Sequence, residues 1–155
     1  MEQPLLCPMP NENRYMLKEE FGASINGSNI LVPRFFVYDG ASIPPAAWQL
    51  TYTPFHPDVM AASLIHDWLY YNHQVNQETA DDIFYELLRS NGVNFLLAKT
   101  MWIAVRSAGS LYWDNNKDER KFLLELYSKV KGDENIAKYH FPSDIIGVPK
   151  TLRNK

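Results

Sequence analysis

The spacing of hydrophobic and polar positions changes near Asp58 and divides the chain into two parts. After Asp58, apolar side chains recur about every 3.6 residues, which is typical of amphipathic helices. We expect Asp58, which follows Pro57, to cap the first helix, and Asn91-Gly92 to end the second. Four helices are predicted, at about residues 59–71, 77–90 and 95–113 and, for the amphipathic stretch "KDERKFLLELYSKV", at residues 117–130.

The part before Asp58 is rich in proline and contains strand-like runs. "NILVPRFFVYDG" (29–40) predicts a strand that ends in a turn, with Pro33 at an edge or a bulge. "RYMLKEEF" (14–21) is its predicted hairpin partner across the loop "GASINGSN". Residues 40–57 hold too many prolines for regular structure and predict an extended connector. The fold class is therefore α+β: a small N-terminal antiparallel sheet or hairpin packed on a bundle of three to four helices.

Length and charge narrow the class of protein. A chain of 155 residues fits a single domain, 1–155, with a core at about 14–131 and extensions at 1–13 and 132–155. The hydrophobic share of 46% and aromatic share of 14% predict a large core, adhesive surfaces, or both. Fifteen basic and eighteen acidic residues give a net charge of -3, so the chain offers no electrostatic reason to expect nucleic acid as a partner.

Cysteine content and hydropathy bear on location. The single Cys7 excludes an internal disulfide and a thiolate zinc site. No basic region followed by an apolar run stands at the start, so we expect no secretory signal and synthesis in the cytoplasm. Lys99 and Arg106 interrupt the most apolar window, "VNFLLAKTMWIAVRSAGSLYW", which predicts a core helix and no transmembrane segment.

A His-Asp pair stands inside the apolar stretch "AASLIHDWLYYN" (61–72). On a helix, Asp67 is rotated about 100° from His66, so only one of them faces inward. On the second helix, Asp81 shares the apolar side with Phe84, whereas Asp82 falls on the wetter side. The short link "NHQVN" makes the two helices antiparallel neighbours, and His66 and Asp81 lie at matching distances from it. We therefore expect these two side chains to meet.

Two interpretations of that pair are open. A carboxylate bound to one ring nitrogen fixes the tautomer and leaves the other nitrogen free as a base or ligand. The same hydrogen bond can instead satisfy two buried groups and serve packing alone. Arg106 could pair with Asp67, Asp81 or Asp82, which would weaken a metal site. His56 and His73 could join His66 at zinc or iron, but we expect both to be loop residues.

Three motifs resemble, in order and spacing, an uncharacterised domain family encoded mainly by tailed phages and prophages. They are "YDGASIPPAAW", "AASLIHDWLYYN" and "ETADDIF", and the resemblance covers roughly residues 28–92. It implies a phage origin. From the residues themselves, Asp39 in the first motif either caps a turn or joins the site of His66.

"HDWLY" and "ADDIF" are also similar to the helices of phospholipase A2, particularly the small bacterial type. This resemblance implies that His66 activates a water, Asp81 orients its ring and Tyr70 hydrogen-bonds Asp81. It also implies Asp67 as a calcium ligand, with Asp39-Gly40 as the candidate for the calcium loop. The glycine-rich loop and the disulfides of secreted phospholipases have no match here.

Two functions follow. The first is a phage virion component, in the tail, baseplate or connector region, whose His-Asp pair is structural. Its extensions would bind other phage structural proteins or a second copy, because tails with aromatics and prolines outside the core pattern dock on neighbours. The alternative is a phospholipase A2-like hydrolase, with calcium as its implied cofactor, that acts on lipid or another cell-envelope ester through His66 and Asp81.

Overall fold

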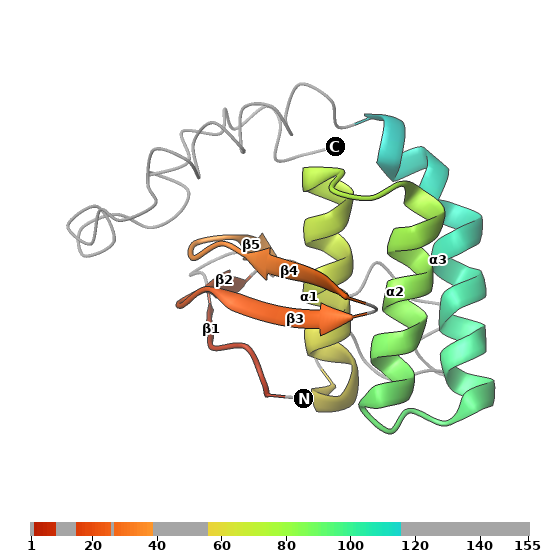
Figure 1. Ribbon diagram of the computed structural model, residues 1–155, viewed down its shortest axis with the longest axis horizontal. Coiled ribbons are helices and arrows are strands. Elements are labelled where there is room, and N and C mark those ends of the chain that lie inside the picture. Colours follow the sequence, from red (N-terminus) through yellow and green to blue (C-terminus); the bar gives the residue numbers. More distant parts are fainter. Residues whose placement is uncertain (1, 9–14, 26, 39–55, 116–155) are drawn as a thin grey trace.

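The computed structural model describes residues 2–8, 15–25, 27–38 and 56–115. Five short strands come first and three helices follow, so the predicted α+β class is confirmed (Figure 1). The strands are β1 (Leu6–Pro8), β2 (Tyr15–Leu17), β3 (Phe21–Ile25), β4 (Ser28–Val32) and β5 (Val37–Tyr38). The helices are α1 (Pro57–Asn72), α2 (Gln77–Ser90) and α3 (Phe95–Asn115).

The strands form two antiparallel sheets, one of three strands in the order β1-β2-β5 and one hairpin of β3 and β4. The predicted pairing of residues 14–21 with residues 29–40 is confirmed, because β2 pairs with β5. The loop expected between them was wrong, because that stretch forms most of β3 and the start of β4, which make a hairpin of their own. Register places Ile25 opposite Ser28. The sequence between them is Asn-Gly, a pair that favours tight hairpin turns, and Gly27 has a φ of 77°.

The predicted single strand at 29–40 is divided at Pro33. Proline has no N–H for a strand ladder, and β4 ends just before it, at Val32. The chain then turns through Phe35, whose φ of 72° lies in the left-handed region. Two backbone hydrogen bonds with Leu17 hold this turn. The Phe35 N–H donates to the Leu17 carbonyl at 2.8 Å, and the Leu17 N–H donates to the Phe36 carbonyl at 2.9 Å. The second half, β5, therefore joins the other sheet.

Helix α1 begins one residue earlier than its predicted cap. The capping residue is His56, with extended backbone and a side chain that accepts from the Asp58 N–H at 3.3 Å, so the prediction of Asp58 as cap was wrong. Pro57 explains the shift, because its fixed φ suits the first helical position. Asp58 lies in the first turn, where its negative charge interacts favourably with the positive end of the helix dipole. His73, with a φ of 52°, closes the helix.

The predicted second and third helices are confirmed. Asn76 caps α2 by accepting from the Thr79 N–H at 2.8 Å, and α2 ends where Asn91 and Gly92 follow, Gly92 having a φ of 93°. Helix α3 runs two residues beyond the predicted end. The predicted connector up to residue 55 and the predicted fourth helix lie outside the described residues.

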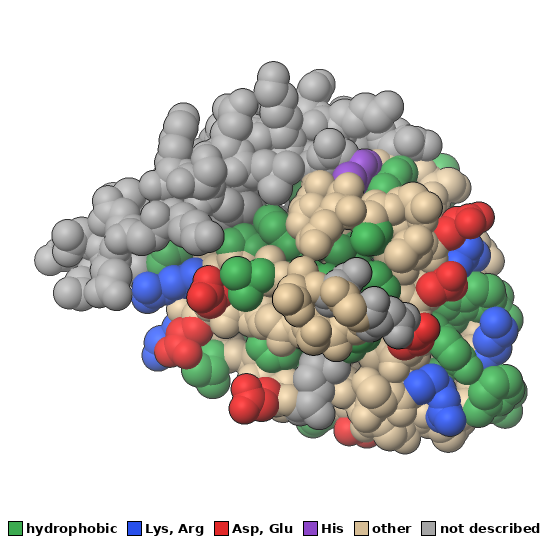
Figure 2. Space-filling model, viewed as in Figure 1, with side chains coloured by type: hydrophobic (Ala, Val, Ile, Leu, Met, Phe, Trp, Pro, Cys, Tyr) green, Lys and Arg blue, Asp and Glu red, His purple; other side chains and the backbone are tan. Residues whose placement is uncertain are grey.

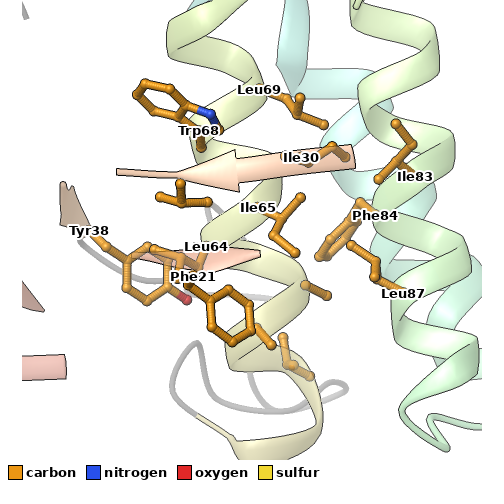
Figure 3. Close-up of a cluster of buried hydrophobic side chains, with 14 of the residues drawn as sticks. Phe21, Ile30, Tyr38, Leu64, Ile65, Trp68, Leu69, Ile83, Phe84 and Leu87 are labelled. Atoms are coloured by element: carbon orange, nitrogen blue, oxygen red, sulfur yellow. The ribbon is translucent and has the colours of Figure 1, made fainter. Parts of the chain in front are cut away.

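Helix α1 lies between the strands and α2, and α3 covers the far side of α2 (Figure 1). Apolar side chains of α1 fill the space on both sides of it (Figure 3). Burial of each such large side chain contributes roughly 1.5–3 kcal/mol. Within the described ranges, no helix has the length and hydropathy to cross a membrane. The labelled core residues in Figure 3 are Phe21, Ile30, Tyr38, Leu64, Ile65, Trp68, Leu69, Ile83, Phe84 and Leu87.

Candidate functional site

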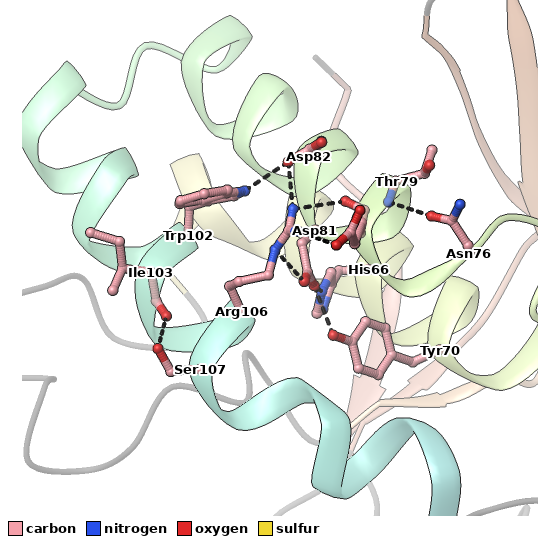
Figure 4. A network of polar contacts seen from close by, with 11 residues as sticks. His66, Tyr70, Asn76, Thr79, Asp81, Asp82, Trp102, Ile103, Arg106 and Ser107 are labelled. Carbon is pink, nitrogen blue, oxygen red and sulfur yellow. Dashed lines mark hydrogen bonds and ion pairs between the residues drawn. The ribbon is translucent and has the colours of Figure 1, made fainter.

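A buried polar pair joins α1 to α2. His66 is 5% exposed and Asp81 is fully buried, and the His66 Nε2 lies 2.8 Å from the Asp81 Oδ1 (Figure 4). The antiparallel hairpin of the two helices brings them together as the sequence predicted. Asp82, the next residue, is turned outward with a side chain that is 60% exposed.

Tyr70 adds a second donor to the same carboxylate oxygen. Its hydroxyl lies one helical turn after His66 and donates to the Asp81 Oδ1 at 2.7 Å. The His66 ring contacts the rings of Tyr70 and Phe84, with centroids 4.3 Å and 5.0 Å away. These contacts fix the orientation of the imidazole. A Cβ at Gly109 of α3 would collide with the Tyr70 hydroxyl, so only glycine leaves room for this hydroxyl there.

Arg106 of α3 completes the surroundings of Asp81. Its Nε lies 3.0 Å from the Asp81 Oδ2, but the N–H is not aligned well enough for a hydrogen bond, so the contact is an ion pair. Its Nη2 donates to the Asp82 Oδ1 at 2.7 Å and to the Glu78 carbonyl at 3.1 Å. The sequence left Asp67, Asp81 and Asp82 as possible partners of Arg106, and Arg106 pairs with Asp81 and Asp82.

The charges of this network follow from what each group can donate. Arg106 can only donate, so the Asp81 carboxyl that faces it is an acceptor and carries a negative charge. The His66 Nε2, bonded to that carboxylate, must then carry a hydrogen. In the neutral ring this leaves Nδ1 without a hydrogen and with its lone pair available. The tautomer is thus assigned from the hydrogen-bond network.

Tyr70 is held in its neutral form. Burial, and then the hydrogen bond to Asp81 and the charge of that carboxylate, raise the pKa of the Tyr70 hydroxyl far above its usual value. The Gln77 side chain and the charge of Arg106 act in the opposite direction and are smaller effects. Tyr70 therefore serves as a hydrogen-bond donor and not as a base near neutral pH.

The other ring nitrogen of His66 faces Asp67. The Nδ1 lies 4.0 Å from the Asp67 Oδ1, too far for a hydrogen bond, and the Asp67 side chain is 13% exposed. Any group that uses the Nδ1 lone pair would therefore also lie near a carboxylate.

Calcium requires six to eight oxygen ligands. The described residues do not supply such a set, since they contain no group of three or more His, Cys, Asp or Glu side chains able to hold a metal. Asp39, the second predicted ligand, lies outside the described residues. His56 and His73 flank opposite ends of the 16-residue α1, about 24 Å apart, so they do not form one metal site with His66.

Sequence reasoning missed three groups around the network. Glu78 adds its carbonyl contact and a carboxylate 3.7 Å from Arg106, Trp102 donates its ring N–H to Asp82 at 3.0 Å, and Gly109 makes room for Tyr70. The spacing of Trp102 and Arg106, four residues apart on one helix face, was a usable signal. Nothing local in the sequence marks Gly109, because the group that needs the space belongs to another helix.

The family described as "Protein of unknown function (DUF1353)" matches residues 15–105. These residues include both helices of the His-Asp pair and the first half of α3.

Two proteins of Sinorhizobium fredii are similar to the chain. "Uncharacterized protein y4iH" is 30% identical over 95 residues, which are 61% of this chain and 40% of that protein. "Uncharacterized protein y4jT" is 39% identical over 87 residues, 54% of this chain and 25% of that protein. The chain thus spans less than half the length of either relative. No solved structure matches it.

Proposed function

This chain belongs to the DUF1353 family, and from its buried site we propose that it is a hydrolase in which His66 activates a water molecule to attack an ester. The observation that carries the proposal is the hydrogen bond of the His66 Nε2 to the fully buried Asp81. That bond fixes the tautomer and leaves Nδ1 as the free base.

The chain's own residues account for the proton movements. The His66 Nδ1 takes a proton from water as the water oxygen bonds to the ester carbonyl carbon. The imidazolium so formed is stabilised by the negative Asp81, which Tyr70 and Arg106 hold in place. When the carbon–oxygen bond to the leaving group breaks, His66 returns the proton to the departing alkoxide and is neutral again.

The substrate class rests on the resemblance of "HDWLY" and "ADDIF" to phospholipase A2. It favours a lipid or another cell-envelope ester. Calcium at Asp67, with Asp39, belongs to the same proposal, and bound calcium would stabilise the negative charge on the ester oxygen. Titration calorimetry with calcium tests this part. Binding that Asp67→Asn abolishes is expected, and equal binding by both proteins would contradict it.

The test of the hydrolase is activity on phospholipid vesicles and short-chain esters. We expect wild-type hydrolysis, and a loss of about 100-fold or more in folded His66→Ala protein assayed below its melting temperature, because general bases contribute about 10²–10⁴-fold. His56→Ala is the matched control and keeps wild-type activity, since His56 caps the start of α1, ten residues before His66. A wild-type protein without activity, or an active His66→Ala, would refute the hydrolase.

A second candidate, a phage tail, baseplate or connector component, is favoured by two observations. Asp81 has partners from within the chain, because His66 and Tyr70 hydrogen-bond its Oδ1 and Arg106 forms an ion pair with its Oδ2. Helix α3 also exposes large apolar side chains along one edge of the molecule (Figure 2). Leu96, for example, is 74% exposed. The resemblance to a family of tailed phages supplies the context.

This candidate predicts binding to other phage structural proteins or to a second copy through the terminal extensions. The test is detection of the protein by mass spectrometry in purified particles. Its presence there, together with absence of hydrolysis, would favour the structural role.

A further inference from the structure

Ser63 carries a buried hydroxyl that no hydrogen bond satisfies. The residue is 1% exposed, and its Oγ has no hydrogen-bond partner in the described part of the chain. An unpaired buried hydroxyl destabilises the folded state, so such groups are rare and point to a bound water or ligand.

Other helical hydroxyls in the same molecule are satisfied locally. Ser90 donates to the Leu87 carbonyl at 2.9 Å. Thr100 and Ser107 donate to the carbonyls four residues earlier, at 2.9 Å and 2.7 Å. This bond to the preceding turn is the usual one for serine and threonine within helices. Ser63 lies within α1 but does not form it, so its hydroxyl is directed elsewhere.

The position of Ser63 on α1 indicates where its partner belongs. Residues three, four and seven positions later on a helix share its face. For Ser63 these are His66, Asp67 and Tyr70, the residues of the proposed site. The free Nδ1 of His66 and the Asp67 carboxylate, 4.0 Å apart, are thus one helical turn from the unsatisfied hydroxyl.

We propose that the Ser63 Oγ and the His66 Nδ1 together bind one water molecule. The water donates one hydrogen to the Nδ1 lone pair and the other to the Ser63 oxygen, which leaves its own lone pairs free. The role of this molecule as the reacting water rests on the proposed hydrolase. The existence of the water site depends only on the two side chains.

A crystal structure of the full chain at about 1.5 Å resolution tests the binding site directly. The expected result is a water oxygen within about 3.2 Å of both the Ser63 Oγ and the His66 Nδ1. No density at that position would overturn the proposal. So would a cation, recognised by oxygen ligands at about 2.3–2.6 Å.

Substitution of the hydroxyl gives a second test. Ser63→Ala is expected to lower kcat about tenfold or more without a change in KM, and not to raise the melting temperature. Ser107→Ala, which removes a locally bonded hydroxyl of α3, is the matched control and keeps wild-type kcat. A Ser63→Ala protein with full activity and a higher melting temperature would show that the hydroxyl is merely unsatisfied, and would overturn the proposal.

The water site and the hydrolase can be refuted independently of each other. Wild-type hydrolysis with full activity in Ser63→Ala and no water in the crystal would remove the water site and leave the hydrolase. A water in the crystal without any hydrolysis would support the binding site and refute the hydrolase.

Discussion

Helix α1 buries two sides that differ in chemistry. On one side, Leu64, Ile65 and Trp68 pack in the apolar core (Figure 3). On the other, His66 and Tyr70 meet the charged carboxylate of α2 (Figure 4). Apolar packing tolerates exchange of side chains of similar volume. A buried polar network does not, since removal of one member leaves the others without partners. The two sides should therefore respond differently to equally conservative substitutions.

The largest expected effect is at the centre of the polar side. Asp81→Asn keeps the shape of the side chain but removes the charge to which His66, Tyr70 and Arg106 are directed. We expect the free energy of unfolding to fall by about 2–4 kcal/mol, measured by urea denaturation. Asp82→Asn is the control from the same helix, and its exposed side chain predicts a loss below about 1 kcal/mol.

Leu64→Met supplies the comparison from the apolar side. Leu64 is fully buried, and this volume-conserving exchange is expected to cost less than about 1.5 kcal/mol. If Asp81→Asn costs no more than Leu64→Met, the contrast between the two sides does not hold.

A smaller effect is expected at the rim of the polar side. Arg106 pairs with Asp81, but its own side chain is 28% exposed, so solvent screens part of the interaction. Arg106→Gln should lower the free energy of unfolding by about 1–2 kcal/mol in urea denaturation. Lys99→Gln is the control. Lys99 lies over the Trp102 ring of the same helix at 3.5 Å but does not contact Asp81. Equal losses in the two variants would contradict a role for the pair with Asp81.

The helical part of the fold was predictable because helix signals are local. Periodicity, the Asn91-Gly92 stop and the short link between α1 and α2 set the antiparallel pair, and with it the meeting of His66 and Asp81. Strand pairing depends on partners distant in the chain, which explains why β3, and the hairpin that it makes with β4, were missed.

The polar side was predictable only in part, for the same reason. The inward turn of Asp81 follows from its place in the row with Phe84 and Leu88. Arg106 pairs with Asp81 and Asp82 because of the way α3 is rotated against α2. The sequence of neither helix specifies that rotation. The space that Gly109 leaves for Tyr70 depends on the same packing.

The smallest expected effect, at Tyr70, separates the two sides by pH. Its hydroxyl has a raised pKa in the folded protein, chiefly through burial. Below about pH 10, tyrosine is protonated in both folded and unfolded chains, and its contribution is fully present. Above that pH the unfolded chain releases the Tyr70 proton while the folded protein keeps it, so the free energy of unfolding falls as pH rises. Urea denaturation between pH 9 and 11 should therefore show a steeper loss for the wild type than for Tyr70→Phe.

Tyr112→Phe is the control for the same chemical change at a tyrosine of α3 that is 55% exposed. It should follow the wild-type pH dependence, because the network around Asp81 is intact in it. If Tyr70→Phe and Tyr112→Phe lose stability with pH at the same rate, Tyr70 is not held neutral by burial and Asp81. Between pH 9 and 11 the Tyr70 hydroxyl would then add no more pH dependence than Leu64, Ile65 and Trp68 on the apolar side, whose side chains do not titrate.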